Sequence, residues 1–309
     1  MKRIAIGCVI LGMVVSGNVL LAGAAEKRLR VVATLSTFGD LAKTIGGDHV
    51  EVYTIASPRF NPHFIEPKPT DVLRVKKADF FVHAGLDLEA WRGPLLDAAG
   101  NREVMPQGSR QVDLSQGIPL LEVPDHSVSR AEGDIHLYGN PHYWVDPENV
   151  KIMAQTLCNG LASVDPAHEA DYRAHLKEFL SRLDAKIPAW RSQLAPYAGQ
   201  ELIGYHNEWP YLMRFTRLKM SQYLEPKPGI PPTPKQIEFL QQYIPAHQVR
   251  AIAQSAYFPT DAADALARRT GVKIVLLCQS VHEVPEASDV IALFDYNVKQ
   301  LVRVLGSGS

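Results

Sequence analysis

The sequence has few cysteines, almost no net charge and only one long apolar run. Of its 3 cysteines, Cys8 lies within that run, which leaves Cys158 and Cys278 for the rest of the chain. Two cysteines exclude a disulfide-rich scaffold, and because they fall in different predicted lobes we expect buried free thiols. A formal net charge of −1 gives no basis for binding nucleic acid or an anionic membrane surface.

The one long apolar run is typical of a secretory signal. It follows Met1-Lys2-Arg3 and ends in Ala22-Gly23-Ala24, a small-residue cleavage pattern. A membrane anchor is the alternative, because the run approaches the length of a bilayer span. The charged Glu26-Lys27-Arg28 that follows favours cleavage, so we predict a signal peptide over residues 1–24 and a periplasmic protein. No cysteine stands at the cleavage point, so no lipid anchor is expected.

Apolar, β-branched runs alternate with helical patterns along the rest of the chain. The predicted buried strands are residues 29–35, 50–56 and 78–84, and later 201–205, 249–253 and 272–277. Strands and helices that alternate at this spacing predict parallel sheets. We therefore predict an α/β fold of two (β/α) lobes with mainly parallel sheets. The chain that remains after the signal peptide is long enough for each lobe to have its own core.

One long helical pattern separates the two groups of strands. It opens at Asp165-Pro166, an N-cap followed by proline at the first helical position, and Pro188 lies inside it. A helix of this length is on the order of 40 Å long, enough to join two lobes. The predicted division is an N-terminal lobe at 25–164, a linking helix at 165–195 and a C-terminal lobe at 196–309.

A short internal echo also indicates two similar lobes that face each other. Glu66-Pro67-Lys68-Pro69 recurs as Glu225-Pro226-Lys227-Pro228, each time between a histidine-bearing loop and a helical pattern.

Three of the 11 histidines differ from the rest. His63, His142 and His206 each stand where a loop leaves a predicted strand or turn, beside aromatic residues or proline. Ligands of open α/β sheets gather at the carboxyl ends of strands. Neutral imidazoles suit zinc and similar ions, whereas calcium and magnesium require oxygen. The spacing is too wide for a local zinc motif, so the residues alone leave a shared metal and independent structural histidines both open.

His142 lies in the stretch around which the chain is organised, from Gly139 to Pro147. A Gly-Asn-Pro turn signal precedes it, two aromatic residues follow it, and the nearby Asp146 could orient its ring. Asp146-Pro147 predicts the start of a helix that we expect to end at Asn159-Gly160.

Together these residues resemble the zinc- and manganese-binding extracytoplasmic solute-binding proteins of metal ABC importers, the cluster A-I family. The resemblance covers essentially the mature length. It is carried by Asn61-Pro62-His63, Glu66-Pro67, Pro69-Thr70-Asp71, Lys77-Ala78-Asp79, Gly85-Leu86, Glu89-Ala90-Trp91, Pro141-His142-Tyr143-Trp144-Val145-Asp146-Pro147, His206, and Glu225-Pro226 with Gly229 and Pro232. It implies two (β/α) lobes joined by one long backbone helix, with the metal between them.

The resemblance also implies a set of ligands. His63 and His142 match the two ligands of the N-terminal lobe and His206 the first ligand of the C-terminal lobe; histidine at this third place goes with Zn²⁺ more often than with Mn²⁺. The family's fourth ligand is usually an aspartate just after the last core strand. This chain has no aspartate there. Gln279 falls nearest to that place, and His282, Glu283 or a water are the alternatives.

The implied function is that of a carrier and not of an enzyme. The family resemblance implies a monomer that binds Zn²⁺ as its transported ligand and delivers it to the membrane permease of a metal ABC importer. A secreted zinc-dependent hydrolase with a three-histidine site is the alternative, with Glu208 as its base, although no His-Glu-x-x-His signature is present. A binding protein for an organic solute would make the histidines incidental. Only His126 and His136 stand where relatives carry a histidine-rich loop, so auxiliary metal capture should be weak.

Overall fold

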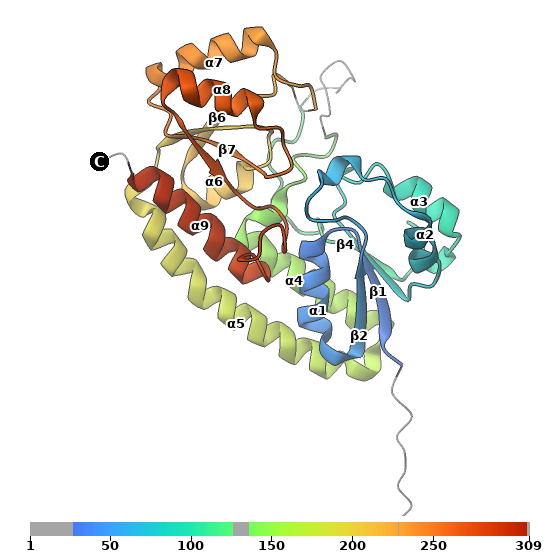
Figure 1. The fold of residues 1–309 in the computed structure, drawn as a ribbon. Coiled ribbons are helices and arrows are strands. Elements are labelled where there is room, and N and C mark those ends of the chain that lie inside the picture. Colours follow the sequence, from blue (N-terminus) through green and yellow to red (C-terminus); the bar gives the residue numbers. More distant parts are fainter. Residues whose placement is uncertain (1–26, 126–135, 228, 308–309) are drawn as a thin grey trace, which may run out of the picture.

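Two parallel sheets of the same topology form the framework of the molecule. The computed structural model describes residues 27–125, 136–227 and 229–307 (Figure 1), so the predicted signal peptide and His126 lie outside the described residues. The first sheet has the order β2-β1-β3-β4 and the second the order β6-β5-β7-β8, with every pair of neighbouring strands parallel. This confirms the predicted α/β fold with two similar (β/α) halves.

The strands are short and end on the side where the two halves meet. The strands are β1 (Leu29–Ala33), β2 (Val50–Thr54), β3 (Phe80–His83), β4 (Gln111–Asp113), β5 (Glu201–Gly204), β6 (Lys219–Tyr223), β7 (Ala251–Gln254) and β8 (Lys273–Leu276). The helices are α1 (Ser36–Gly46), α2 (Pro69–Lys76), α3 (Arg92–Ala99), α4 (Pro147–Val164), α5 (Glu169–Leu194), α6 (Pro210–Thr216), α7 (Pro234–Ala246), α8 (Asp261–Thr270) and α9 (Val290–Gly306). The sequence did not predict β4, β6, α3 or α6.

Helix α5 runs along the base of both halves, as Figure 1 shows, and packs against α1, α4 and α9. Its 26 residues confirm the predicted long helix, and Pro188 lies inside it. One face is buried at helical spacing, from Tyr172 through Phe179 and Trp190 to Leu194. The polar residues of α5 stand on the opposite face.

The apolar core is more continuous than the sequence predicts. One cluster joins α1 and α4 of the first half to α5, α6 and α9, and it includes Val275 of the second sheet. Two smaller clusters lie farther out, one around Phe81 in the first half and one around Ile252 in the second. The expectation of separate cores is therefore wrong: each half has an outer cluster of its own, and both share the inner one.

Helix α4 does not end at Asn159-Gly160, as the sequence predicted, but continues to Val164. A Cβ atom at Gly160 would lie 2.7 Å from Cζ of the Phe80 ring. The glycine is needed here for close packing of the helix on β3 and not as a helix terminator. The helix tolerates it because tertiary packing outweighs the roughly 1 kcal/mol that glycine costs in a helix.

Cys158 and Cys278 are free and buried, which confirms the expected thiols. Within residues 27–125, 136–227 and 229–307, no helix combines the length and the apolar character that a bilayer crossing requires.

The contact between α1 and the start of α9 contains a carboxylate whose charge costs stability. Asp40 accepts a hydrogen bond of 3.0 Å from the Val290 backbone N–H. Burial raises the pKa of Asp40 to about 6, and the nearby Asp289 contributes to this shift. Because the native state binds this proton more tightly than the unfolded chain, protonation stabilises the fold, and this stabilisation is lost as pH rises through about 6.

We predict that Asp40→Asn unfolds at higher urea concentration than the wild-type protein at pH 7.5. The gain is up to about 2 kcal/mol, and it shrinks as pH falls towards 4 because the wild-type carboxyl group then takes up its proton. Urea unfolding at both pH values measures the difference. Asp48→Asn, on the exposed segment after α1, is the matched control. If the difference in free energy of unfolding between Asp40→Asn and the wild-type protein were the same at both pH values, the raised pKa of Asp40 would be contradicted.

Candidate metal centre

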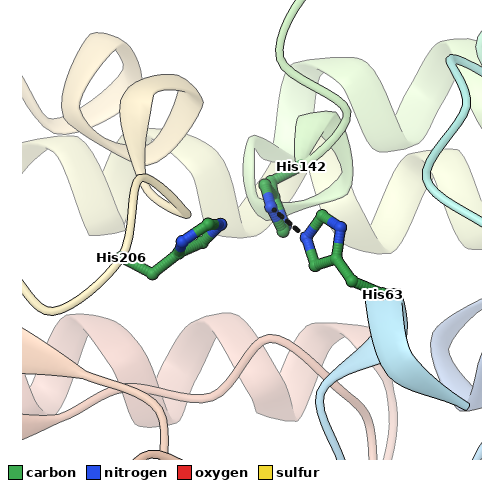
Figure 2. Close-up of side chains that lie close together, drawn as sticks. All are labelled: His63, His142 and His206. Carbon is green, nitrogen blue, oxygen red and sulfur yellow. Dashed lines mark hydrogen bonds between the residues drawn. The ribbon is translucent and has the colours of Figure 1, made fainter. Parts of the chain in front are cut away.

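Three histidines that are far apart in the sequence converge between the two sheets. Figure 2 shows the rings of His63, His142 and His206 reaching towards one another from three separate segments. Each offers one nitrogen atom, and these atoms all lie within 4.8 Å of one another. In the part of the chain that the structure describes, these histidines form the one such cluster of potential metal ligands. The three rings are buried, with exposed fractions of 7%, 1% and 5%.

The distances fit a tetrahedral transition-metal ion. The Nε2 atoms of His63 and His142 lie 3.1 Å apart. Two nitrogens that each bind zinc at about 2.0–2.1 Å stand roughly 3.3 Å apart in tetrahedral geometry. The residues present therefore fit such an ion with a small adjustment of the rings.

His63 is held by the loop that follows β2. It lies in a short 3-10 helix, Pro62–Phe64, whose N-cap Asn61 accepts a hydrogen bond of 3.0 Å from the His63 backbone N–H. The Trp91 indole donates a hydrogen bond of 2.9 Å to the Pro62 carbonyl oxygen. The proline and the two hydrogen bonds fix this backbone before any ligand binds.

His142 is held from both halves. Its backbone N–H donates to the Asn140 side chain at 3.0 Å, and Asn140 in turn donates to the backbone oxygen of Asn207 at 2.9 Å. The Nδ1 atom of His142 lies 3.0 Å from the side-chain oxygen of Gln279. An amide oxygen can only accept, so Nδ1 carries the proton and the Nε2 lone pair faces the cluster.

His206 and its partner come from neighbouring strands. His206 follows β5, and Glu225 follows β6, which pairs with β5 in parallel. The Glu225 carboxylate lies 2.6 Å from Nδ1 of His206, and both side chains are buried. A carboxylate in this place fixes the tautomer and strengthens the imidazole as a ligand. The sequence marks Glu225 through the repeated Glu-Pro-Lys-Pro segment, but the echo does not predict this role, because the equivalent Glu66 is exposed.

The environment keeps two of the rings uncharged. Burial lowers the pKa of His63 and of His142 well below the usual value of 6.5, and the neighbouring histidines lower both further. Neutral imidazoles retain the lone pairs that a metal ion needs. The cluster is thus prepared for a cation at neutral pH.

The candidates for the fourth ligand are placed differently from one another. The Gln279 side-chain oxygen contacts Nδ1 of His142, on the side of that ring away from Nε2. His282 is exposed. The Glu283 carboxylate accepts hydrogen bonds from the backbone N–H groups of Gln279, Ser280 and Ala256, at 3.0, 3.2 and 3.2 Å. His282 and Glu283 are not part of the cluster of ligand atoms, and Gln279 is placed to orient His142.

The sequence suggested Asp146 as the residue that orients His142, and this was wrong. Asp146 caps α4 by accepting from the Glu148 N–H at 2.9 Å and forms an ion pair of 2.8 Å with Arg214 of α6. Gln279 has the orienting role instead. Sequence spacing could not show this, because Gln279 approaches from 137 residues away.

A family profile and several solved structures are similar to this chain over most of its length. The profile of a family described as "Zinc-uptake complex component A periplasmic" matches residues 31–304. A crystal structure of ZnuA superimposes with a TM-score of 0.77 at 25% identity and covers 90% of this chain and 99% of that chain. The SBP FpvC from Pseudomonas aeruginosa in complex with Mn²⁺ has a TM-score of 0.79 at 23% identity, over 92% of this chain and 100% of that one.

Curated relatives agree on metals but differ in coverage. A putative metal-binding protein of Treponema pallidum is 25% identical over 253 residues, which is 80% of this chain and 78% of that protein. A manganese ABC transporter substrate-binding lipoprotein of Streptococcus gordonii is 30% identical over 164 residues, 52% of this chain and 49% of that protein. The match to the streptococcal protein therefore spans about half of its length.

We predict that Glu225→Ala lowers metal affinity by about 10- to 100-fold, because the His206 ring loses the partner that fixes its tautomer. Titration in competition with a chromophoric chelator measures the effect. Glu66→Ala, which removes the exposed glutamate of the first Glu-Pro-Lys-Pro segment, is the matched control and should leave affinity unchanged. Equal losses in both variants would contradict a specific role for Glu225.

Proposed function

The chain belongs to the family of the periplasmic component A of zinc-uptake complexes, and on this premise we propose that it captures Zn²⁺ with His63, His142 and His206 and delivers it to the membrane permease of an ABC importer. The observation that carries this proposal is the convergence of three buried imidazole nitrogens from both halves of the fold. In this proposal the ion is cargo, and the protein acts outside the cytoplasm after removal of residues 1–24.

The preference for Zn²⁺ over Mn²⁺ rests on the donor atoms. The three convergent donors are imidazole nitrogens, which suit Zn²⁺, whereas Mn²⁺ prefers carboxylates, carbonyls and water. Glu225, the carboxylate nearest to His206, is engaged with Nδ1 on the far side of that ring. Two of the relatives are named as manganese ABC transporter substrate-binding lipoproteins, so similarity alone does not select the ion. The proposal of Zn²⁺ therefore rests on the donor atoms.

Capture and release require ligands that can be separated. His63 and His142 belong to the first half of the fold and His206 follows β5 of the second. We propose that residues 25–164 and 196–309 act as two metal-binding lobes joined by residues 165–195, and that docking on the permease moves the lobes enough to weaken the site. Preformed loops reduce the ordering cost of binding.

The residue that a hydrolase would use as its base is unsuited to that role. Glu208 is 1% exposed and accepts hydrogen bonds from the hydroxyl groups of Ser255, at 3.1 Å, and Tyr257. Burial raises the pKa of Glu208 well above its usual range. Because its oxygens are engaged by the Ser255 and Tyr257 hydroxyl groups, the Glu208 carboxyl group is not placed to take a proton from a metal-bound water, which supports the carrier over the zinc hydrolase.

We predict that His142→Ala no longer retains stoichiometric Zn²⁺ through gel filtration, while its circular dichroism matches that of the wild-type protein. The fold should persist because the imidazole ring is not part of the shared apolar core. His247→Ala, at an exposed position after α7, is the control and should keep its zinc. Retention of one Zn²⁺ by His142→Ala would show that the site is assigned wrongly.

We further predict that Zn²⁺ at equimolar concentration displaces Mn²⁺ from the loaded wild-type protein, and that Mn²⁺ does not displace Zn²⁺. The expected order follows from nitrogen donors and from the general affinity order of divalent ions. Elemental analysis after gel filtration of chelator-stripped, reloaded protein measures the exchange. Displacement of Zn²⁺ by Mn²⁺ would overturn the proposed cargo.

A further inference from the structure

A fourth histidine beside the cluster has a buried ring nitrogen that lacks a hydrogen-bond partner in the described part of the chain. The Nε2 atom of His136 is buried and has no hydrogen-bond partner among the residues that the structure describes. Its Nδ1 atom lies 2.8 Å from the Asp87 carboxylate, and the side chain is only 11% exposed. A buried polar atom without a partner is costly and needs an explanation, and an absent ligand is one.

The position of His136 is that of a neighbour of the three convergent rings. The centroids of the His136 and His63 rings lie 5.0 Å apart, compared with 5.1 Å between His63 and His142 and 5.5 Å between His63 and His206. His136, His142 and His206 also line one cavity of about 340 Å³. The ring is therefore next to the place where the metal would be held.

The hydrogen bonding of His136 repeats that of two cluster histidines. Nδ1 of His142 contacts Gln279, Nδ1 of His206 contacts Glu225, and Nδ1 of His136 contacts Asp87. In each case the partner is an oxygen atom that accepts, which leaves the Nε2 lone pair for a metal.

The turn that supplies Asp87 is itself unusual. Gly85, Leu86 and Asp87 follow one another with φ angles of 70°, 50° and 57°. Two successive residues with side chains in the left-handed region strain the backbone. The turn places the Asp87 carboxylate so that it accepts from both the His136 ring and the Leu137 backbone N–H, the latter at 3.1 Å. Strain kept at such a place indicates a functional turn.

We propose that Nε2 of His136 is the fourth ligand atom of the captured ion and that Asp87 orients the His136 ring. This rests on the proposed function, because it assigns a ligand to the same site. His136 is not among the three histidines whose nitrogens all lie within 4.8 Å of one another, so the proposal requires its ring to move inward when the ion binds. Four imidazoles close a tetrahedral site and leave no metal-bound water.

Three measurements on the mature full-length protein test the proposal. In wild-type protein labelled with ¹⁵N-histidine and loaded with Zn²⁺, four Nε2 signals should shift to the metal-bound range. In His136→Gln only three signals should shift, and the visible spectrum of the Co²⁺-loaded protein should change. Zinc affinity should fall at least as much as when an orienting partner is lost, which is about 10- to 100-fold. Asp87→Ala should lower affinity by less and keep the fourth signal.

His247→Gln, at an exposed position, is the matched control and should leave all three measurements unchanged. If the wild-type protein binds one Zn²⁺ but shows only three shifted signals, and His136→Gln has the wild-type affinity and Co²⁺ spectrum, the fourth ligand is overturned while the proposed function stands. If the wild-type protein holds no stoichiometric metal, both fall. The wild-type count decides the matter even if a variant fails to fold.

Discussion

The candidate metal centre depends on how the Nδ1 protons of His142 and His206 are held. A side-chain oxygen accepts the Nδ1 proton of His142 and another that of His206, so each Nε2 lone pair has one direction available to it. Without these partners each ring could exchange tautomers or rotate. The arrangement in which the Nε2 lone pairs point towards one another would then be only one of several conformations. In the proposed site, the residues that hold the rings therefore matter for binding as well as the histidines that would contact the ion.

Several contacts hold the two sides of the site in register. The Trp144 indole donates to the Gln279 carbonyl oxygen at 2.9 Å, and the Ser36 hydroxyl group donates to the Val281 carbonyl oxygen at 2.7 Å. Both tie the segment after β8 to the first half of the fold. Arg214 of α6 pairs with Asp146, the N-cap of α4. The segment that carries His142 is thus clamped between two elements of the second half.

The sequence predicts the framework well and the environment of the site poorly, for physical reasons. An apolar pattern can be recognised within a single segment, so most of the strands and α5 could be predicted. The strand β6, whose residues are all exposed or half-buried, could not. Residues 111–113 are too short to show a period, and Gly160 looked like a helix end because its contact with Phe80 is not local. The orienting role of Gln279 and the approach of His136 depend on side chains from distant segments, and no spacing rule describes them.

The shared apolar cluster sets how far the halves can travel. Parting α1 and α4 from α9 would wet side chains that the cluster keeps dry, at about 2.5 kcal/mol for every 100 Å² exposed. The free energy needed for a wide opening of the two halves would soon exceed the free energy of unfolding of the whole protein. The two halves can therefore move only a short distance relative to each other. A small sliding movement between them is enough to disturb a tetrahedral arrangement of ligands. Under the proposed function, release would then require only a small displacement, imposed by a partner that contacts both halves at once.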